Sequence, residues 1–387
     1  MSHTRQGQRR RHIGLVTPGF SASDDDWCIP ALLTLVRHLV AHHDVTVYTL
    51  RYPHQAHTYQ VSGARVRSFG GATAGGWRRL PLLWRAIRTI VGDARQKPFA
   101  LLHGLWADEA GFVAGVAARR CAVPSLVSLM GGELVRLPEA AYGVQLSRSG
   151  RFLTGASLRL ANLVTAGSRQ LLDRATSYVT RDRLRRAPLG VDLSLFRPGP
   201  SSDDPGLRIV HAASLTAVKD QETLLGAFTQ VRRALPETGI SLHIAGDGPL
   251  LGTLKRRAER LDMARFVHFH GAISHERMPD FYRLGDLFVL SSLYESQSVA
   301  ILEAAACGLP AVGTAVGLLP ELLPESLLAN PRDEEELARA MLSLLEHDRM
   351  RREEAQRIQS RVSTSYRLEA TIPRLLAIYD ELMTEAA

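Results

Sequence analysis

The sequence predicts an α/β protein built from two Rossmann-like, doubly wound domains that face a common cleft. Short β-branched or apolar runs alternate along the chain with stretches of helical periodicity, which is typical of a mostly parallel sheet covered by helices. This alternation restarts after residues 198–205 (PGPSSDDP), a segment rich in turn-forming residues. The chain of 387 residues is long enough for two or three domains, each with its own core.

The first half of the chain supplies the first predicted domain. It opens with an apolar run, HIGLVT, that has the length of a buried strand and leads into a loop rich in Gly, Ser and Asp. The later run DVTVYTL has the same β-branched character. The predicted strands are residues 12–17, 44–50, 100–103, 125–130 and 162–165. The predicted helices are residues 29–41, residues 107–120 and a helix that ends before residue 162.

The second half repeats the pattern. Its first strand is predicted at LRIVHA, and its first helix follows at residues 223–234. The predicted strands are residues 207–212, 241–245, 266–270, 287–290 and 311–313. Another helix is expected from about Val299, and residues 367–383 carry apolar side chains at helical spacing. We therefore expect domains at residues 1–198 and 199–365, followed by a final helical segment at 366–387.

The composition excludes several classes of protein. Apolar residues make up 45% of the chain and charged residues 22%, which is ordinary for a globular protein and excludes a disordered chain. Gly and Pro interrupt the most apolar stretch, residues 304–320, so we predict no transmembrane helix. The apolar patch after the basic N-terminus is too short for a signal peptide. Three scattered cysteines, Cys28, Cys121 and Cys307, argue against a disulfide framework, so we expect a cytoplasmic protein.

The net charge of +8 is unevenly distributed. Residues 1–198 contain 27 Arg and Lys against 12 Asp and Glu, whereas residues 199–387 contain 20 against 27. Two halves of opposite charge either face different partners or are simply solvated surfaces of unlike charge. Basic residues are spread, aromatic residues make up only 6%, and no nucleic-acid-binding module is recognised, so we expect no nucleic acid partner.

Residues 74–97 combine Trp77 and Trp84 with several arginines at helical spacing. Such a segment either lies in the interface of an anionic membrane or is an ordinary helix whose apolar side packs on the sheet. The first alternative allows a peripheral position at the inner membrane face and a lipid-linked or anionic acceptor.

Three loops that follow predicted strands carry residues suited to a ligand. Ligands of open α/β sheets bind beyond the carboxyl ends of the strands. Lys219 precedes a helix and could face a phosphate, and Gly246 lies in a tight turn that allows close approach. Glu295 and Glu303 flank a loop and a helix start, where amide groups favour an anion and carboxylates bind sugar hydroxyls. A solvated lysine, a common turn and a surface glutamate are the structural alternatives.

Taken in order, these loops resemble a known family. The segments SLTAVKD, AGDGP and FHGAISHERMPDFYRLGDLFVLSSLYESQSVAILEAAACGLPAVGT, preceded by LGVD and FRP, resemble glycosyltransferase family 4, the group 1 retaining glycosyltransferases of GT-B fold. Glu295 and Glu303 match the family's E-x7-E signature, and Lys219 matches its phosphate-binding lysine. The resemblance is strong from about residue 186 to 325 and compatible with the whole chain.

The resemblance implies transfer of a sugar from a nucleotide diphospho-sugar, with retention at the anomeric carbon. The second domain would bind the nucleotide and the first the acceptor, and the C-terminal helix would cross back to the first domain. Lys219 would stabilise the diphosphate, Glu303 would hold the ribose and Glu295 would contact the donor sugar. The expected donor-binding residues are Ser214, Lys219, Gly246, Ala272, Ile273, Glu295, Ser298, Val299, Ala300 and Glu303. Lys219 and Glu295 are the expected catalytic residues, and Gly19, His103 and Glu133 are expected on the acceptor side.

The expected co-substrate is the nucleotide sugar. The resemblance implies that no cofactor or metal is required, and the sequence shows no His/Cys cluster that would hold a metal. The expected acceptor is a glycan, a lipid-linked molecule or a small molecule.

The chain departs from the family's pattern at several positions. Ser214 lies where the family usually has an Arg after Gly, and Ser296, Gln297 and Ser298 replace common glycines. Met130 lies where many members carry a His, and the glycine loop after the first strand is reduced to Pro-Gly-Phe. A catalytically inactive sugar-nucleotide-binding relative and a GT-B fold epimerase or phosphorylase therefore stay open as alternatives.

Overall fold

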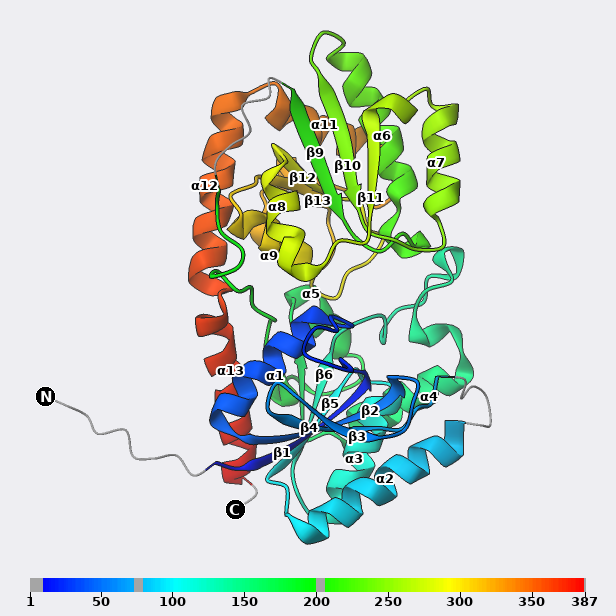
Figure 1. Cartoon of the computed structure of the whole chain (residues 1–387), viewed down its shortest axis with the longest axis vertical. Coiled ribbons are helices and arrows are strands. Elements are labelled where there is room, and N and C mark those ends of the chain that lie inside the picture. The colour runs from blue at the N-terminus through cyan, green and yellow to red at the C-terminus, as the bar shows by residue number, and fades with distance from the viewer. Residues whose placement is uncertain (1–9, 73–78, 200–205, 386–387) are drawn as a thin grey trace, which may run out of the picture.

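The computed structural model describes residues 10–72, 79–199 and 206–385, and within them the chain forms two sheets with helices on both faces. Figure 1 shows the two lobes stacked along the long axis, with the last two helices running down one side past both. The strand order is β3-β4-β2-β1-β5-β6-β7-β8 in the first sheet and β11-β10-β9-β12-β13-β14 in the second. Among the described strands only β3 and β4 pair antiparallel. The predicted fold class is confirmed.

The first lobe contains the eight-stranded sheet. Its strands are β1 (His12–Gly19), β2 (Asp44–Tyr52), β3 (Thr58–Val61), β4 (Ala64–Ser68), β5 (Leu101–Leu105), β6 (Ser125–Leu129), β7 (Leu163–Ala166) and β8 (Leu184–Arg186). Its helices are α1 (Pro30–His42), α2 (Arg79–Gln96), α3 (Glu109–Cys121), α4 (Arg148–Leu160) and α5 (Arg169–Ala175). The sequence did not predict β3, β4, β8 or α5, which are all short, and of these β3 and β8 are the edge strands of the sheet.

The second lobe contains the six-stranded sheet. Its strands are β9 (Leu207–Ala212), β10 (Ile240–Ala245), β11 (Val267–Gly271), β12 (Leu287–Leu290), β13 (Ala311–Thr314) and β14 (Leu328–Ala329). Its helices are α6 (Gln221–Ala234), α7 (Leu251–Arg260), α8 (Met278–Arg283), α9 (Val299–Ala306), α10 (Leu319–Leu322), α11 (Glu334–Leu345) and α12 (Asp348–Ser365). The expected strand at residues 266–270 begins one residue later, because Phe266 belongs to a 3-10 turn.

The final helix, α13 (Leu368–Glu385), returns to the first lobe as expected. Its apolar side, with Ile372, Tyr379 and Leu382, packs into the same cluster as strand β1 and helix α1. The opposite face of the first sheet is covered by α2, α3 and α4. The two chain segments that link the lobes lie side by side, since a parallel bridge joins Val191 to Arg367.

The limits expected for the domains stay predictions, and residues 200–205 of the predicted linker lie outside the described residues. No helix in the described ranges is both long enough and apolar enough to cross a membrane.

Candidate functional site

A cleft of about 1130 Å³ lies between the lobes, at the carboxyl ends of strands from both sheets. Every expected donor-side residue lines this cleft, namely Ser214, Lys219, Gly246, Ala272, Ile273, Glu295, Ser298, Val299, Ala300 and Glu303. These residues come from the loops after β9, β10, β11 and β12 and from the start of α9. Parallel strands gather such loops at one edge of a sheet, so residues far apart in sequence meet here.

Lys219 and Glu295 form an ion pair in the cleft wall. Lys219 ends the 3-10 turn η5 (Ala217–Lys219), and its Nζ lies 2.6 Å from Oε1 of Glu295. The same carboxylate oxygen accepts a 2.7 Å hydrogen bond from Oγ of Ser292. The Glu295 side chain is only 9% exposed, which strengthens the attraction between the two charges. The pair therefore presents an oriented cation and carboxylate to any ligand in the cleft.

Glu303 lies in the second turn of α9 and is held by two donors. The hydroxyl of Tyr282 donates to Oε2 of Glu303 at 2.8 Å, and Nε2 of His275 lies 3.3 Å from Oε1. Burial and the charge of Glu303 hold the pKa of Tyr282 well above its ordinary value, so its hydroxyl stays protonated and donates. The His275 ring stacks on Trp27 of the first lobe with ring centres 4.8 Å apart. Glu303 is thus fixed in orientation, close to a contact between the lobes.

The start of α9 offers backbone amides to the cleft. Ser298 is the N-cap residue, and its side chain makes no capping hydrogen bond. The first N–H groups of a helix have no partner within the helix, and together with the helix dipole they favour an anion. Ser298 has φ +71°, a conformation that favours glycine and that strains a residue with a Cβ.

The loops after β9 and β10 pack too tightly to allow a side chain at Gly246. Its φ is +137°, and a Cβ there would overlap the carbonyl oxygen of Ala213. Ala272 and Ile273 continue from the neighbouring strand β11 and line the same part of the cleft. Among the described residues that line the cleft, Lys219 is the only Lys or Arg. Ser214 therefore leaves the cleft without the second cation common in the resembled family.

The three expected acceptor-side residues do not line the cleft. Gly19 is buried at the end of β1. His103 is buried between Tyr379 and Ser128: its Nδ1 lies 2.8 Å from the tyrosine hydroxyl and its Nε2 lies 2.7 Å from Oγ of Ser128. Burial lowers the pKa of His103 to about 3, so the ring is neutral. It faces a separate cavity of about 60 Å³ beside α13.

Glu133 holds two loops of the first lobe together. Its side chain is fully buried, and its carboxylate accepts hydrogen bonds from the amides of Ala107 (3.2 Å), Met130 (2.9 Å) and Gly131 (2.7 Å). These amides belong to the segments that follow β5 and β6. Burial raises the pKa of Glu133, although the three amides oppose this shift. The residue therefore fixes the two loops that follow β5 and β6 relative to each other.

The first-lobe wall of the cleft consists of residues that the sequence did not single out. Asp25, Asp26, Trp27 and Trp106 line it. Asp26 is held by the hydroxyl of Tyr52 at 2.8 Å. Trp106 has φ +74°, which is unusual for a bulky residue and strains its backbone. The Asp run ahead of Trp27 was the available signal, but sequence alone does not show that it faces the cleft.

The serine and glutamine that replace the family's glycines bind the first lobe. Oγ of Ser296 donates to the carbonyl of Met130 at 2.7 Å. The Gln297 side chain accepts from the amide of Leu189 and donates to its carbonyl, both at 2.8 Å. Tyr294 adds a 3.0 Å hydrogen bond to the carbonyl of Gly131. The loop that carries Glu295 is thus tied to the opposite lobe, and Met130 lies beside it.

Two family models match consecutive parts of the chain. Residues 31–195 match the model described as Glycosyltransferase Family 4, and residues 206–347 match the model described as Glycosyl transferases group 1. Solved structures share the fold over nearly the whole chain. Sucrose-phosphate synthase from Thermosynechococcus elongatus has a TM-score of 0.78 and 20% identity, covering 97% of this chain and 100% of that one. HepE of Anabaena in complex with UDP and glucose has a TM-score of 0.76 and 18% identity, covering 96% and 100%.

Curated relatives align over shorter regions. Mannosylfructose-phosphate synthase of Agrobacterium fabrum is 29% identical over 188 residues, which cover 44% of this chain and 41% of that protein. A GDP-mannose-dependent phosphatidylinositol monomannoside mannosyltransferase of Mycolicibacterium smegmatis is 33% identical over 178 residues, which cover 42% and 46%. The chain thus spans less than half the length of these relatives. With both halves matched in order and the fold shared throughout, the chain belongs to the family 4, group 1 glycosyltransferases of GT-B fold.

Proposed function

We propose that the protein transfers a sugar from a nucleoside diphosphate sugar to a hydroxyl group of an acceptor, with retention, in the cleft between the lobes. The observation that carries this proposal is the joint lining of the cleft by the Lys219–Glu295 pair, by Glu303 and by the first amides of α9. The cation and the amides suit the diphosphate of such a donor. The two carboxylates suit the hydroxyl groups of its ribose and of its sugar.

The second lobe holds the donor in this proposal. The diphosphate lies against Lys219 and the amides of Val299 and Ala300, where a fixed cation and the helix dipole favour negative charge. The ribose hydroxyls bind Glu303, and the base lies near Ala272 and Ile273. As the bond from the anomeric carbon to the diphosphate breaks, negative charge grows on the leaving oxygen. Lys219 stabilises that charge more strongly in the transition state than in the ground state.

The first lobe holds the acceptor. Its wall offers the carboxylates of Asp25 and Asp26 and the rings of Trp27 and Trp106, a combination that suits a hydroxyl-rich molecule such as a sugar. Free sugars, glycans and lipid-linked glycans all present such an end. The acceptor oxygen forms the new bond to the anomeric carbon, and its proton passes to the departing phosphate.

A reducing compartment such as the cytoplasm is supported by Cys28, Cys121 and Cys307, which are all free thiols.

A nucleotide-binding assay tests the donor half of this proposal. Thermal unfolding is measured with UDP, GDP, ADP and CMP for the wild type, for Lys219→Ala and Glu303→Ala, and for the control Lys255→Ala on the exposed side of α7. A nucleotide at about a hundred times its Kd adds about 2.7 kcal/mol to the free energy of unfolding. We expect one nucleotide to raise the Tm of wild type and control but not of the two cleft variants. No response to any nucleotide contradicts the proposal.

Donor turnover then separates an enzyme from an inactive relative. Two observations favour the inactive relative. The cleft lining has a single Lys or Arg among the described residues, and Met130 lies at the family's histidine position. Release of the nucleoside diphosphate from its sugar donor, in the presence of acceptor mixtures, establishes transfer. Binding of the donor without its turnover identifies the inactive relative.

A further inference from the structure

Three helices of the first lobe form a continuous outer surface. Helices α2, α3 and α4 pack into one cluster on the same face of the first sheet (Figure 1). The guanidinium of Arg120 on α3 lies 5.0 Å from the ring centre of Trp84 on α2. Nη2 of Arg79 at the start of α2 donates to Oγ of Ser149 on α4 at 3.0 Å. We call the outward side of these helices the three-helix face. It comprises Leu80, Trp84, Arg88, Phe112, Val116, Arg119, Arg120, Leu146, Arg148, Arg151, Phe152 and Arg159.

Apolar side chains protrude from this face. The inward side of α2, with Leu83, Ile87 and Ile90, is buried in the lobe, so the packing alternative was right for that stripe. Residues 74–78 of the predicted amphipathic segment, Trp77 included, lie outside the described residues. The outward stripe combines arginine with apolar side chains, because Leu80 is 45% exposed and Trp84 48% exposed beside the exposed Arg88.

Helix α4 adds to the apolar character of the face. Phe152 is 68% exposed and Leu146, just ahead of the helix, is 37% exposed. Phe112 and Val116 of α3 lie half-buried between the two stripes. Four of the seven large apolar or aromatic side chains exposed in the described chain belong to this face: Leu80, Trp84, Leu146 and Phe152.

The charge on this face is positive and unopposed. Its arginines are exposed, and Arg88, Arg119, Arg148 and Arg159 have no ion pair within the described ranges. The acidic residues on the three helices are engaged elsewhere. Asp93 of α2 is buried and bound by Tyr48 and Arg67.

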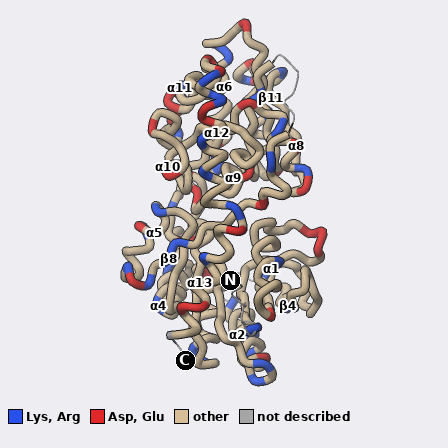
Figure 2. The backbone as a smooth tube through the Cα atoms, turned by 90° about the vertical axis from the view of Figure 1, so that its left-hand side faces the viewer, with Lys and Arg blue, Asp and Glu red and all other residues tan. Residues whose placement is uncertain are grey.

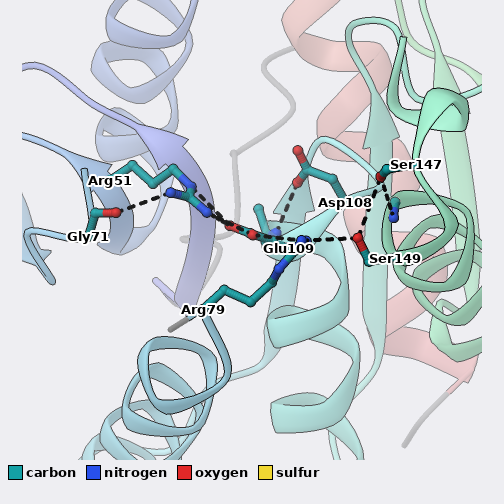
Figure 3. A network of polar contacts seen from close by, with 9 residues as sticks. Arg51, Gly71, Arg79, Asp108, Glu109, Ser147 and Ser149 are labelled. Atoms are coloured by element: carbon teal, nitrogen blue, oxygen red, sulfur yellow. Dashed lines mark hydrogen bonds and ion pairs between the residues drawn. The ribbon is translucent and has the colours of Figure 1, made fainter. Parts of the chain in front are cut away.

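Glu109 of α3 is bound by Arg51 and Arg79, as Figure 3 shows, and α4 has no acidic residue. By contrast, the side of the molecule with α12 and α13 carries charges of both signs (Figure 2).

We propose that the three-helix face docks on the surface of an anionic phospholipid bilayer. Burial of the protruding Leu80, Trp84 and Phe152 in an apolar medium is favourable, and the arginines around them attract anions. The interface of such a bilayer offers both within a few ångströms of depth. A nucleic acid supplies anions, and its bases can stack on aromatic rings, but it offers no apolar medium for Leu80. The proposal stands on this surface alone and does not depend on the transfer reaction.

Vesicle co-sedimentation of the full chain tests the proposal. Phosphatidylcholine vesicles are compared with vesicles that contain phosphatidylglycerol as well, at low and at high salt. We expect the wild type to bind only the anionic vesicles, and less at high salt. Trp84→Glu and Phe152→Glu should each lower the partition coefficient at least tenfold. Arg88→Gln combined with Arg148→Gln should lower it about 25-fold, since each arginine near the surface contributes about fivefold.

Met350→Glu is the matched control. Met350 is an apolar residue of comparable exposure, 40%, on α12 of the second lobe, and its substitution should leave binding unchanged. The Tm of each variant without vesicles shows whether the fold is kept. Three results overturn the proposal: no binding by the wild type, equal binding to neutral vesicles, or equal loss in Met350→Glu and Trp84→Glu. Vesicle binding by a protein that binds no nucleotide overturns the proposed function and leaves this inference intact.

Discussion

Lys219 and Glu295 are 76 residues apart in the chain and meet at 2.6 Å in the wall of the cleft. The pair joins the loop after β9 to the loop after β12. Glu295 therefore orients the lysine before a donor binds. A bound anion would then be a second partner for the same cation.

Replacing Lys219 by Ala should lower donor turnover by about two to three orders of magnitude, because the leaving diphosphate loses its fixed cation. Steady-state release of the nucleoside diphosphate is the measurement. Lys255→Ala, a change of the same chemistry at an exposed site, should leave turnover within twofold of the wild type. Unchanged turnover in Lys219→Ala would exclude the lysine from the reaction.

Replacing Tyr282 by Phe should weaken nucleotide binding by about tenfold. The change removes the 2.8 Å hydrogen bond to Glu303 but keeps the buried ring, so the carboxylate loses its fixed orientation. Titration calorimetry measures the Kd. The matched control is Tyr48→Phe, which removes a 2.6 Å hydrogen bond from a buried tyrosine to Asp93 in the first lobe. An equal loss of affinity in both variants would show an effect of stability alone.

Replacing Ser298 by Gly should stabilise the protein by about 1 kcal/mol, which corresponds to a rise in Tm of about 1 °C for a chain of 387 residues. The residue has φ +71°, and its hydroxyl caps no helix amide, so the substitution relieves strain without losing a hydrogen bond. Differential scanning calorimetry is the measurement. Ser298→Ala keeps the Cβ and should bring no gain. A lower Tm for Ser298→Gly than for Ser298→Ala would show that the backbone at this position is not strained.

Replacing Gln297 by Glu should destabilise the protein more than replacing it by Ala. A carboxylate facing the Leu189 carbonyl cannot donate, so Gln297→Glu leaves two acceptors opposed at a buried site and costs about 2 kcal/mol at pH 8. Thermal unfolding gives the order of the variants, and small-angle X-ray scattering reports any loosening of the lobes. If Gln297→Ala is the less stable of the two, the side chain acts through packing instead.

The free energy of unfolding should fall as the pH drops below about 6.5, in part because of His103. Burial lowers the pKa of this histidine to about 3, so between pH 6.5 and 3 the unfolded chain binds a proton that the folded chain does not. In His103→Gln the slope of unfolding free energy against pH should shrink by one proton, about 1.4 kcal/mol per pH unit. Denaturant titrations at pH 7, 6, 5 and 4 measure it. His211 and His243, each with a pKa lowered to about 4, should keep part of the remaining slope.

The parts of the site that the sequence could predict are those built from local patterns. Lys219 and Glu295 lie in loops that follow apolar strands, and Glu303 lies in the second turn of the helix after the second loop. Parallel strands bring such loops to one edge. Strands such as β9 and β12 are buried, so their apolar runs are unambiguous.

The hairpin of β3 and β4 was not predicted because its strands are only four and five residues long, and exposed Thr58 and Gln60 alternate with Tyr59 and Val61 in place of a continuous apolar run.

The remainder depends on contacts between distant segments. Glu133 was expected to face the acceptor, yet its carboxylate meets the amide of Ala107 from a neighbouring strand as well as those of its own loop. Sequence spacing does not show that the loop with Ala107 lies beside the loop with Glu133. Likewise, Leu83 and Trp84 are neighbours in one amphipathic pattern, and only the packing of α3 and α4 shows that one is buried and the other exposed.

The return of α13 to the first lobe has a consequence for biosynthesis. His103 and Tyr379, which share a hydrogen bond, are 276 residues apart, so one wall of the first core is translated long after the sheet that it covers. Until then, β1 and α1 expose the apolar face that Ile372, Tyr379 and Leu382 will cover. The first half of the nascent chain therefore keeps this apolar surface exposed, and is prone to aggregate, until the second lobe has been synthesised. We expect a fragment ending near residue 198 to require a chaperone to stay in solution, and co-expression with residues 199–387 to rescue it.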